Sequence, residues 1–246
     1  MKQNLSPTTL LFALLAAACS DPGPTEPTES AAGAFAPDDT DGGGGRTEPR
    51  DEGGPWEPPS ETGDVFLPYT PYKCGYAVRQ ISPSNPATRF HDSAAGPAPQ
   101  PKNLHLTIPG NAATSVAFSW ATDAATLQTE VRFGESPSNL DKVARGFSFA
   151  SGSRRQHELH LCGLKPGTTY YYDAGGPAAR SRVYRFTTAP DGPSEVTLLV
   201  VGDTRSNPSI WGEMAPNVMA HGAAAFLFSG DAVGTGSEQG QWDALF

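Results

Sequence analysis

Two aspartates in the last quarter of the chain stand where carboxylates could bind a metal ion. Asp203 follows the run VTLLVVG and Asp231 follows AAFLFSG, so each comes directly after a glycine that ends an apolar segment. Continuous apolar runs over residues 196–201 and 224–228 predict strands of a parallel sheet that is covered on both faces. Open α/β sheets bind ligands at the carboxyl ends of such strands. We therefore expect both side chains at a ligand-binding edge.

The spacing of these aspartates strengthens the prediction. Residues 210–220 have helical apolar spacing interrupted by Pro216, so the segment predicts one β-α-β unit. Neighbouring strands lie about 4.8 Å apart, close enough for two carboxylates to share a divalent cation. A single Gly-Asp pair would be weak evidence, because aspartate often caps a following helix. Two pairs that flank one unit favour a metal site.

Arg205, two residues after the first aspartate, is a candidate catalytic residue of another kind. A guanidinium keeps its protons and cannot coordinate a cation, but it can hold a substrate phosphate through two parallel hydrogen bonds. An ion pair with Asp231 or with a surface carboxylate is an equally good interpretation. His221 ends the predicted helix, where the helix dipole favours a cation, and we expect no metal ligation from it.

The residues that precede this unit predict a β-sandwich. Between residues 102 and 190, short alternating segments are separated by turn residues. In one of them Val116, Phe118 and Trp120 fall on one face by period two, which predicts that Trp120 lies in the core. The predicted strands cover residues 104–108, 115–120, 129–133, 157–161, 169–174 and 182–187.

The N-terminal region predicts export. Lys2, an apolar run over residues 10–18 and a small-residue site before Cys19 indicate a signal peptide over residues 1–19. The run is shorter than the roughly 20 residues that a membrane-spanning helix needs, so we do not expect a permanent transmembrane helix here. The letters LAAAC resemble a bacterial lipoprotein signal, which implies that Cys19 is lipidated and anchors the protein to a membrane of the cell envelope. The alternative is ordinary cleavage followed by secretion, with Cys19 incidental.

Two further segments connect the signal to the sandwich. Residues 20–64 are acidic and rich in proline and glycine, with almost no apolar pattern, so they predict a disordered tether. Residues 65–101 regain aromatic and apolar residues between several prolines. We expect an irregular arm that packs on the next domain.

The remaining cysteines, Cys74 and Cys162, allow two interpretations. In an oxidising compartment they could form a disulfide, or they could be two separate buried thiols, because sequence does not show how far apart they lie. His157 and His160 stand close to Cys162 in the letters HELHLC. This order predicts a strand with Leu159 and Leu161 facing inward, rather than a zinc site.

The charge of the chain argues against nucleic-acid binding. The formal net charge is -9 at pH 7, so there is no basic surplus to neutralise phosphates of a DNA or RNA backbone.

One resemblance covers the sandwich. The letters LCGLKPGTTYYYDAGG followed by YRFTTAP resemble the end of a fibronectin type III domain. In particular they resemble the version that precedes the catalytic domain in purple acid phosphatases, and SWATD and VRFGESPSNL fit the same pattern. The turn over residues 164–168 that leads into Tyr170 matches a tyrosine corner, in which the phenol hydroxyl ties a strand to an upstream backbone group.

A second resemblance covers residues 195–246. The pair GDTR and GDAVGTGSEQGQWDALF resembles the first two motifs of the calcineurin-like metallophosphoesterases, which include the purple acid phosphatases. It implies a phosphate ester substrate and divalent or trivalent iron, manganese or zinc, with Asp203 on the first metal and Asp231 bridging both. The chain departs from the family at Arg205, where many members have histidine, and at Gly234, where purple acid phosphatases have a tyrosine ligand of ferric iron.

The expected fold is therefore mainly β: a fibronectin III-like sandwich, then a β-α-β fragment of an α/β metallophosphoesterase domain, after a disordered tether. The later metal-binding motifs of the family do not occur after residue 231. We expect an incomplete phosphoric ester hydrolase that is inactive as this chain. The alternative is a cell-surface lipoprotein whose fibronectin III-like domain is a binding or spacer module.

Overall fold

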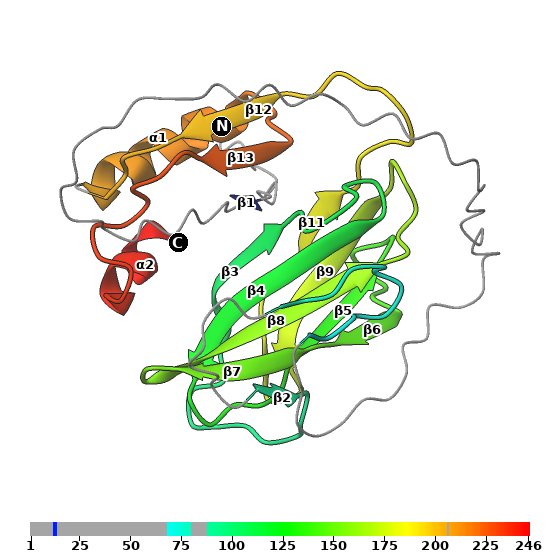
Figure 1. The fold of residues 1–246 in the computed structure, drawn as a ribbon, viewed down its shortest axis with the longest axis vertical. Coiled ribbons are helices and arrows are strands. Elements are labelled where there is room, and N and C mark those ends of the chain that lie inside the picture. Colours follow the sequence, from blue (N-terminus) through cyan, green and yellow to red (C-terminus); the bar gives the residue numbers. More distant parts are fainter. Residues whose placement is uncertain (1–11, 14–67, 80–87, 206) are drawn as a thin grey trace, which may run out of the picture. The chain divides into compact units, whose positions relative to one another are not determined.

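A computed structural model describes residues 12–13, 68–79, 88–205 and 207–246 (Figure 1). The predictions for Cys19, for the tether over residues 20–64 and for all of the signal peptide except residues 12–13 lie outside the described residues. Those two residues form the short strand β1 (Phe12–Ala13), which pairs in parallel with β13 (Ala225–Phe228).

Residues 88–187 form a β-sandwich of two antiparallel sheets, so the predicted fold class is confirmed. The first sheet has the strand order β2-β7-β8-β4-β3, and the second has the order β10-β9-β5-β6 with β11 also paired to β9. The ribbon in Figure 1 shows β4 and β8 running side by side through the middle of the first sheet. The strands are β2 (Thr88–Phe90), β3 (Lys102–Thr107), β4 (Ser115–Asp123), β5 (Glu130–Gly134), β6 (Lys142–Arg145), β7 (Phe147–Ser151), β8 (Arg154–Cys162), β9 (Thr169–Gly176), β10 (Ala179–Arg180) and β11 (Tyr184–Thr187).

The core lies between the two sheets and is built by alternation along the strands. Phe118 and Trp120 of β4 are fully buried, which confirms the predicted position of Trp120. Leu159 and Leu161 of β8 also face the core, as the sequence predicts. From the second sheet, Tyr172 meets Phe118 edge to face with ring centroids 4.9 Å apart. Packing of large side chains from both sheets is the main source of stability here.

The predicted tyrosine corner is present. The Tyr170 hydroxyl accepts a hydrogen bond from the backbone N–H of Lys165 at 3.0 Å. Between these residues the chain turns at Gly167, whose φ of +60° suits glycine best. The hydroxyl of Thr188 donates to the Lys165 carbonyl at 2.7 Å. These hydrogen bonds, together with that from the Gly167 N–H to the Ala189 carbonyl, hold the turn at the end of the sandwich.

Some strands of the sandwich were not predicted. β6 and β7 fall between the third and fourth predicted strands, and β2 and β10 are only three and two residues long. β2 comes from the region predicted as an irregular arm, and it pairs with β7. Phe90 of β2 is buried.

After the sandwich, the chain forms the predicted β-α-β unit. It consists of β12 (Leu198–Val201), α1 (Pro208–Ala220) and β13, followed by a short helix α2 (Gln239–Leu245) that was not predicted. β12 and β13 are parallel neighbours with Leu199 opposite Phe226. Trp211 of α1 packs edge to face on Phe226 and Phe228. This contact fixes α1 on the sheet, although Pro216 lies inside the helix.

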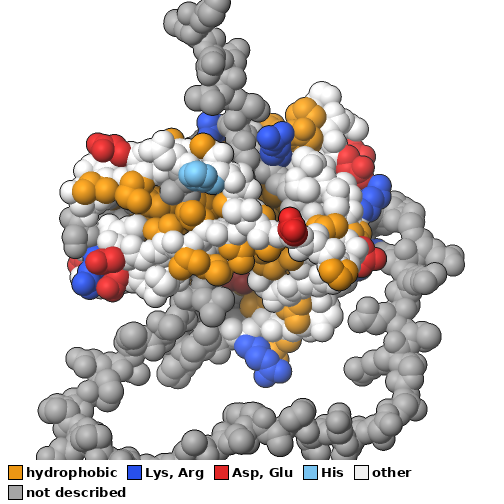
Figure 2. All heavy atoms as spheres, turned by 90° about the horizontal axis from the view of Figure 1, so that it is seen from above, with side chains coloured by type: hydrophobic (Ala, Val, Ile, Leu, Met, Phe, Trp, Pro, Cys, Tyr) orange, Lys and Arg blue, Asp and Glu red, His pale blue; other side chains and the backbone are white. Residues whose placement is uncertain are grey.

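One side of β12 carries exposed apolar side chains. Leu198 and Val200 of β12 and Val196, which precedes the strand, are all exposed, as are Ile210 and Met214 of α1. Figure 2 shows bands of hydrophobic side chains on the face that looks toward the top of Figure 1. Among the described residues, no helix has the length and apolar character needed to cross a membrane.

Candidate functional site

The two predicted metal ligands share an unusual backbone conformation. Asp203 and Asp231 have φ angles of +57° and +54°, in the left-handed region that few side chains other than those of asparagine and aspartate visit. Each follows a glycine. A Cβ on Gly202 would overlap the Ser229 hydroxyl, and Gly230 has a φ of +129°. The two aspartates at the ends of β12 and β13 therefore share a left-handed backbone, whereas the glycines before them serve different needs: close approach at Gly202 and a positive φ at Gly230.

Hydrogen bonds connect the two turns directly. The backbone N–H of Asp203 donates to the Gly230 carbonyl at 3.2 Å, and the N–H of Arg205 donates to the Asp231 carbonyl at 3.1 Å. The Thr204 hydroxyl donates to the carbonyl of Ala232 at 3.0 Å. Both aspartates thus lie beside one another at the carboxyl ends of neighbouring parallel strands.

Arg205 forms ion pairs with both aspartates. Its Nε lies 3.3 Å from Asp203 Oδ1, and its Nη1 lies 3.3 Å from Asp231 Oδ1. The side chains are open to solvent, with exposed fractions of 46% for Arg205, 76% for Asp203 and 53% for Asp231. Exposed pairs of this kind contribute little to stability, roughly 0–1 kcal/mol each.

The donor set does not fit the two-metal centre that the family resemblance implies. Two carboxylates converge, but within the described part of the chain no group of three or more His, Cys, Asp or Glu side chains could hold a metal ion. The guanidinium of Arg205 also interacts with both carboxylates where a cation would need them. His221 follows the end of α1, and Gly234 lies in the loop between β13 and α2.

The sequence left the pairing of Cys74 and Cys162 open. In the structure the two residues form a disulfide, with Cα atoms 5.0 Å apart.

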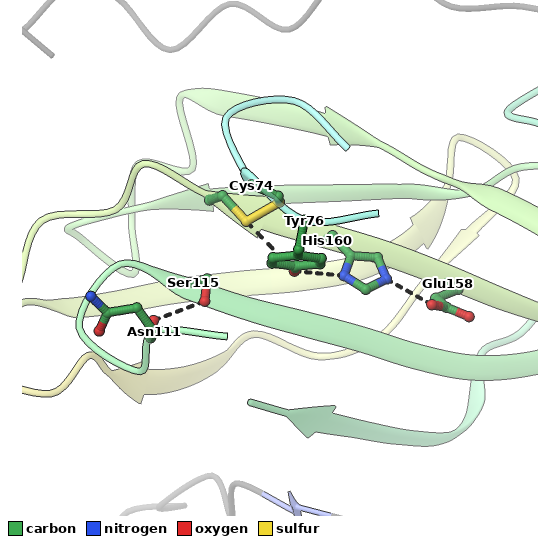
Figure 3. The surroundings of a disulfide bond; sticks show 7 residues. Cys74, Tyr76, Asn111, Ser115, Glu158 and His160 are labelled. Atoms are coloured by element: carbon green, nitrogen blue, oxygen red, sulfur yellow. Dashed lines mark hydrogen bonds and ion pairs between the residues drawn. A yellow bond between two sulfur atoms is a disulfide. The ribbon is translucent and has the colours of Figure 1, made fainter. Parts of the chain in front are cut away.

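Beside this disulfide, three polar side chains form a hydrogen-bonded cluster. The Tyr76 hydroxyl lies 2.8 Å from His160 Nδ1, and His160 Nε2 lies 2.6 Å from Glu158 Oε1 (Figure 3). Burial, and secondly the negative charge of Glu158, raise the pKa of Tyr76 well above its ordinary value. A phenol that keeps its proton is a hydrogen-bond donor, so we interpret this cluster as structural.

Sequence reasoning missed this Tyr76–His160–Glu158 cluster. The alternation of β8 places Glu158, His160 and Cys162 on the face opposite Leu159 and Leu161, which was a usable signal. What it lacked was the partner, because Tyr76 is 84 residues away from His160. His157 faces the core instead and stacks on Trp120 with ring centroids 5.1 Å apart.

Comparison with known proteins gives three similarities. Residues 101–188 match the family described as the purple acid phosphatase N-terminal domain. The chain is 26% identical to purple acid phosphatase 21 of Arabidopsis thaliana over 166 residues, which are 65% of this chain and 36% of that protein. A solved structure described as the structure of PhoD is similar with a TM-score of 0.40 and 16% identity, over 57% of this chain and 29% of that one. The chain spans about a third of the length of the plant relative.

Proposed function

We propose that this chain, whose sandwich matches the N-terminal domain of purple acid phosphatases, is part of an exported hydrolase of phosphoric esters. The observation that carries the proposal is the order of its parts. Directly after the matched region, two Gly-Asp turns bring Asp203 and Asp231 together at the carboxyl ends of parallel strands. That is the edge at which α/β sheets bind ligands.

In this proposal the three charged side chains of the turns act on the metal ions and on the substrate. Asp203 and Asp231 are metal ligands, and Arg205 contacts a phosphate oxygen of the substrate. The family implies divalent or trivalent metal ions such as iron, manganese or zinc in a complete enzyme. Because two carboxylates are too few to fix such a centre, we propose that further ligands come from residues beyond those of this sequence and that this chain alone is inactive.

The test compares this chain with a longer protein that restores the rest of a phosphatase domain. Hydrolysis of p-nitrophenyl phosphate and of bis-p-nitrophenyl phosphate is measured with manganese, zinc or iron added. We expect turnover only in the longer protein, and we expect Asp203→Asn and Asp231→Asn each to abolish it. Metal-dependent turnover by the short chain that both substitutions remove would show that its own residues suffice.

A second candidate function is a cell-surface lipoprotein with the sandwich as a binding or spacer module, and the observation that favours it is the signal-like stretch before Cys19. The protein would then be attached to a membrane through lipid on Cys19. Labelling with a radioactive fatty acid should mark the wild-type protein and not Cys19→Ser. If the wild type takes up no label, the protein is secreted or retained by other means.

A further inference from the structure

We propose that Arg205 is an internal counter-ion that occupies the place of a cation between Asp203 and Asp231 and weakens divalent-cation binding by this pair. The inference rests on the proposed function for the role of the two carboxylates. It adds a competing cationic group to that site, because a cation must displace the guanidinium before it can use both carboxylates.

The geometry favours this role over an incidental surface contact. Two different nitrogens of one guanidinium, Nε and Nη1, each lie 3.3 Å from a different carboxylate. One planar group therefore spans both aspartates. The backbone N–H of Arg205 donates to the Asp231 carbonyl, so the backbone places the residue at the site independently of its side chain.

The charges determine the expected size of the effect. The guanidinium reduces the local charge of the carboxylate pair from two negative charges to one. All three side chains are substantially exposed, so solvent and salt screen the interaction. For such exposed groups we expect the loss of the positive charge to strengthen divalent-cation binding about fivefold, rather than by orders of magnitude.

The experiment measures binding of manganese(II) to the full chain at low ionic strength, from the electron paramagnetic resonance signal of the free ion. Wild type is compared with Arg205→Gln, which keeps the size of the side chain and removes its charge, and with Arg205→Lys, which keeps the charge. The chain contains 26 aspartates and glutamates, so unspecific binding is subtracted with Asp203→Asn introduced into the Arg205→Gln protein. Arg205→Ala serves as a second neutral variant.

We expect about fivefold tighter manganese binding in Arg205→Gln and Arg205→Ala, and a change below about twofold in Arg205→Lys. The gain should disappear when Asp203→Asn is added. Equal affinity in wild type and both neutral variants would overturn the proposal, and so would a gain that survives Asp203→Asn. If a longer protein lacked phosphatase activity, the proposed function would fail while this difference in affinity remained.

Discussion

At the residue scale, Trp120 combines a large buried ring with an indole N–H that lacks a hydrogen-bond partner among the described residues. Its side chain is fully buried and stacks on His157. Its indole N–H has no hydrogen-bond partner among the described residues. A buried unpaired donor typically costs about 1–3 kcal/mol, which offsets part of the stabilisation from burial of the ring.

We expect Trp120→Ala to lower the free energy of unfolding by about 3–5 kcal/mol, as truncation of large aromatic side chains in cores does. Trp120→Phe should lower it by clearly less, because it keeps much of the aromatic surface and removes the unpaired N–H. Urea denaturation followed by circular dichroism gives both values. If both variants lost the same free energy of unfolding, the aromatic surface of Trp120 would not be the source of its stabilising effect.

His157 is the second residue with a measurable consequence. Its ring nitrogens lie 2.7 Å from the Thr122 hydroxyl and 2.8 Å from the Thr129 hydroxyl. Burial, and secondly the positive charge of Arg155, lower the pKa of His157 to about 3. The folded protein therefore keeps this imidazole neutral at a pH where the unfolded chain, with an ordinary histidine pKa of about 6.5, binds a proton.

The sign of the pH dependence follows from this difference. Below about pH 6.5 the unfolded state takes up the proton and the folded state does not, so stability should fall as the pH is lowered, by at most about 1.4 kcal/mol per pH unit for one proton. Burial also lowers the pKa values of His91 and His105, which adds to the slope. We therefore expect His157→Gln to reduce the slope of unfolding free energy between pH 6 and pH 5 without removing it. Identical slopes in wild type and His157→Gln would contradict the lowered pKa of His157.

At the element scale, the segment over residues 68–79 is attached to the sandwich in three chemically different ways. Tyr69 and Val78 form a small antiparallel bridge within the segment. The disulfide joins it to β8, across 88 residues of sequence. The hydrogen bond from Tyr76 to His160 makes a second attachment to the same strand. The Tyr69 ring also packs edge to face on Phe147 of β7.

Removal of this disulfide should destabilise the sandwich by about 2–4 kcal/mol, because the cross-link lowers the conformational entropy of the unfolded chain. The measurement is the free energy of unfolding of a Cys74→Ser, Cys162→Ala protein. Wild type in dithiothreitol is the matched control and should move to a similar value. A melting temperature that does not respond to dithiothreitol would mean that the bond does not form in solution.

Much of the sandwich could be predicted because its central strands alternate clearly. β4 and β8 place Phe118, Trp120, Leu159 and Leu161 on one side and polar or small residues on the other. β7 was missed although Phe147 is buried, because its alternation covers few residues and its pairing with β8 is a tertiary property. The same holds for β2, whose place is set by β7.

The candidate site shows a similar limit. Apolar runs that end in Gly-Asp were sufficient to place Asp203 and Asp231 at the carboxyl ends of β12 and β13. An ion pair between Arg205 and Asp231 was one interpretation of the sequence, and the structure contains it. The left-handed backbone of the two aspartates and the simultaneous pairing of Arg205 with Asp203 could not be predicted. Both depend on hydrogen bonds between two turns that are about as far apart in sequence as the β-α-β unit is long, and no local pattern encodes these bonds.

At the scale of the whole molecule, the sandwich uses residues that precede Lys102. β2 adds a strand to the first sheet. The backbone N–H of Gly96 donates to the Thr126 hydroxyl, and that of Ala98 donates to Asp123 Oδ2, each at 3.0 Å. Residues of the predicted arm therefore pack on the sandwich over residues 102–190 and contribute one strand to it.

We expect a fragment of residues 102–190 to fold, because the cluster around Trp120, Phe118 and Tyr172 lies within it. A fragment of residues 68–190 should be more stable by several kcal/mol, since it restores the disulfide, which typically contributes about 2–4 kcal/mol, and buries Phe90. Urea unfolding of both fragments, with and without dithiothreitol, separates these contributions. Under reducing conditions the longer fragment should keep part of its advantage, because β2 and the bonds to Asp123 and Thr126 remain. If reduction makes the two fragments equally stable, residues 68–101 add nothing to the sandwich beyond the disulfide of Cys74. If the shorter fragment gives a random-coil circular dichroism spectrum, the core alone does not hold the fold.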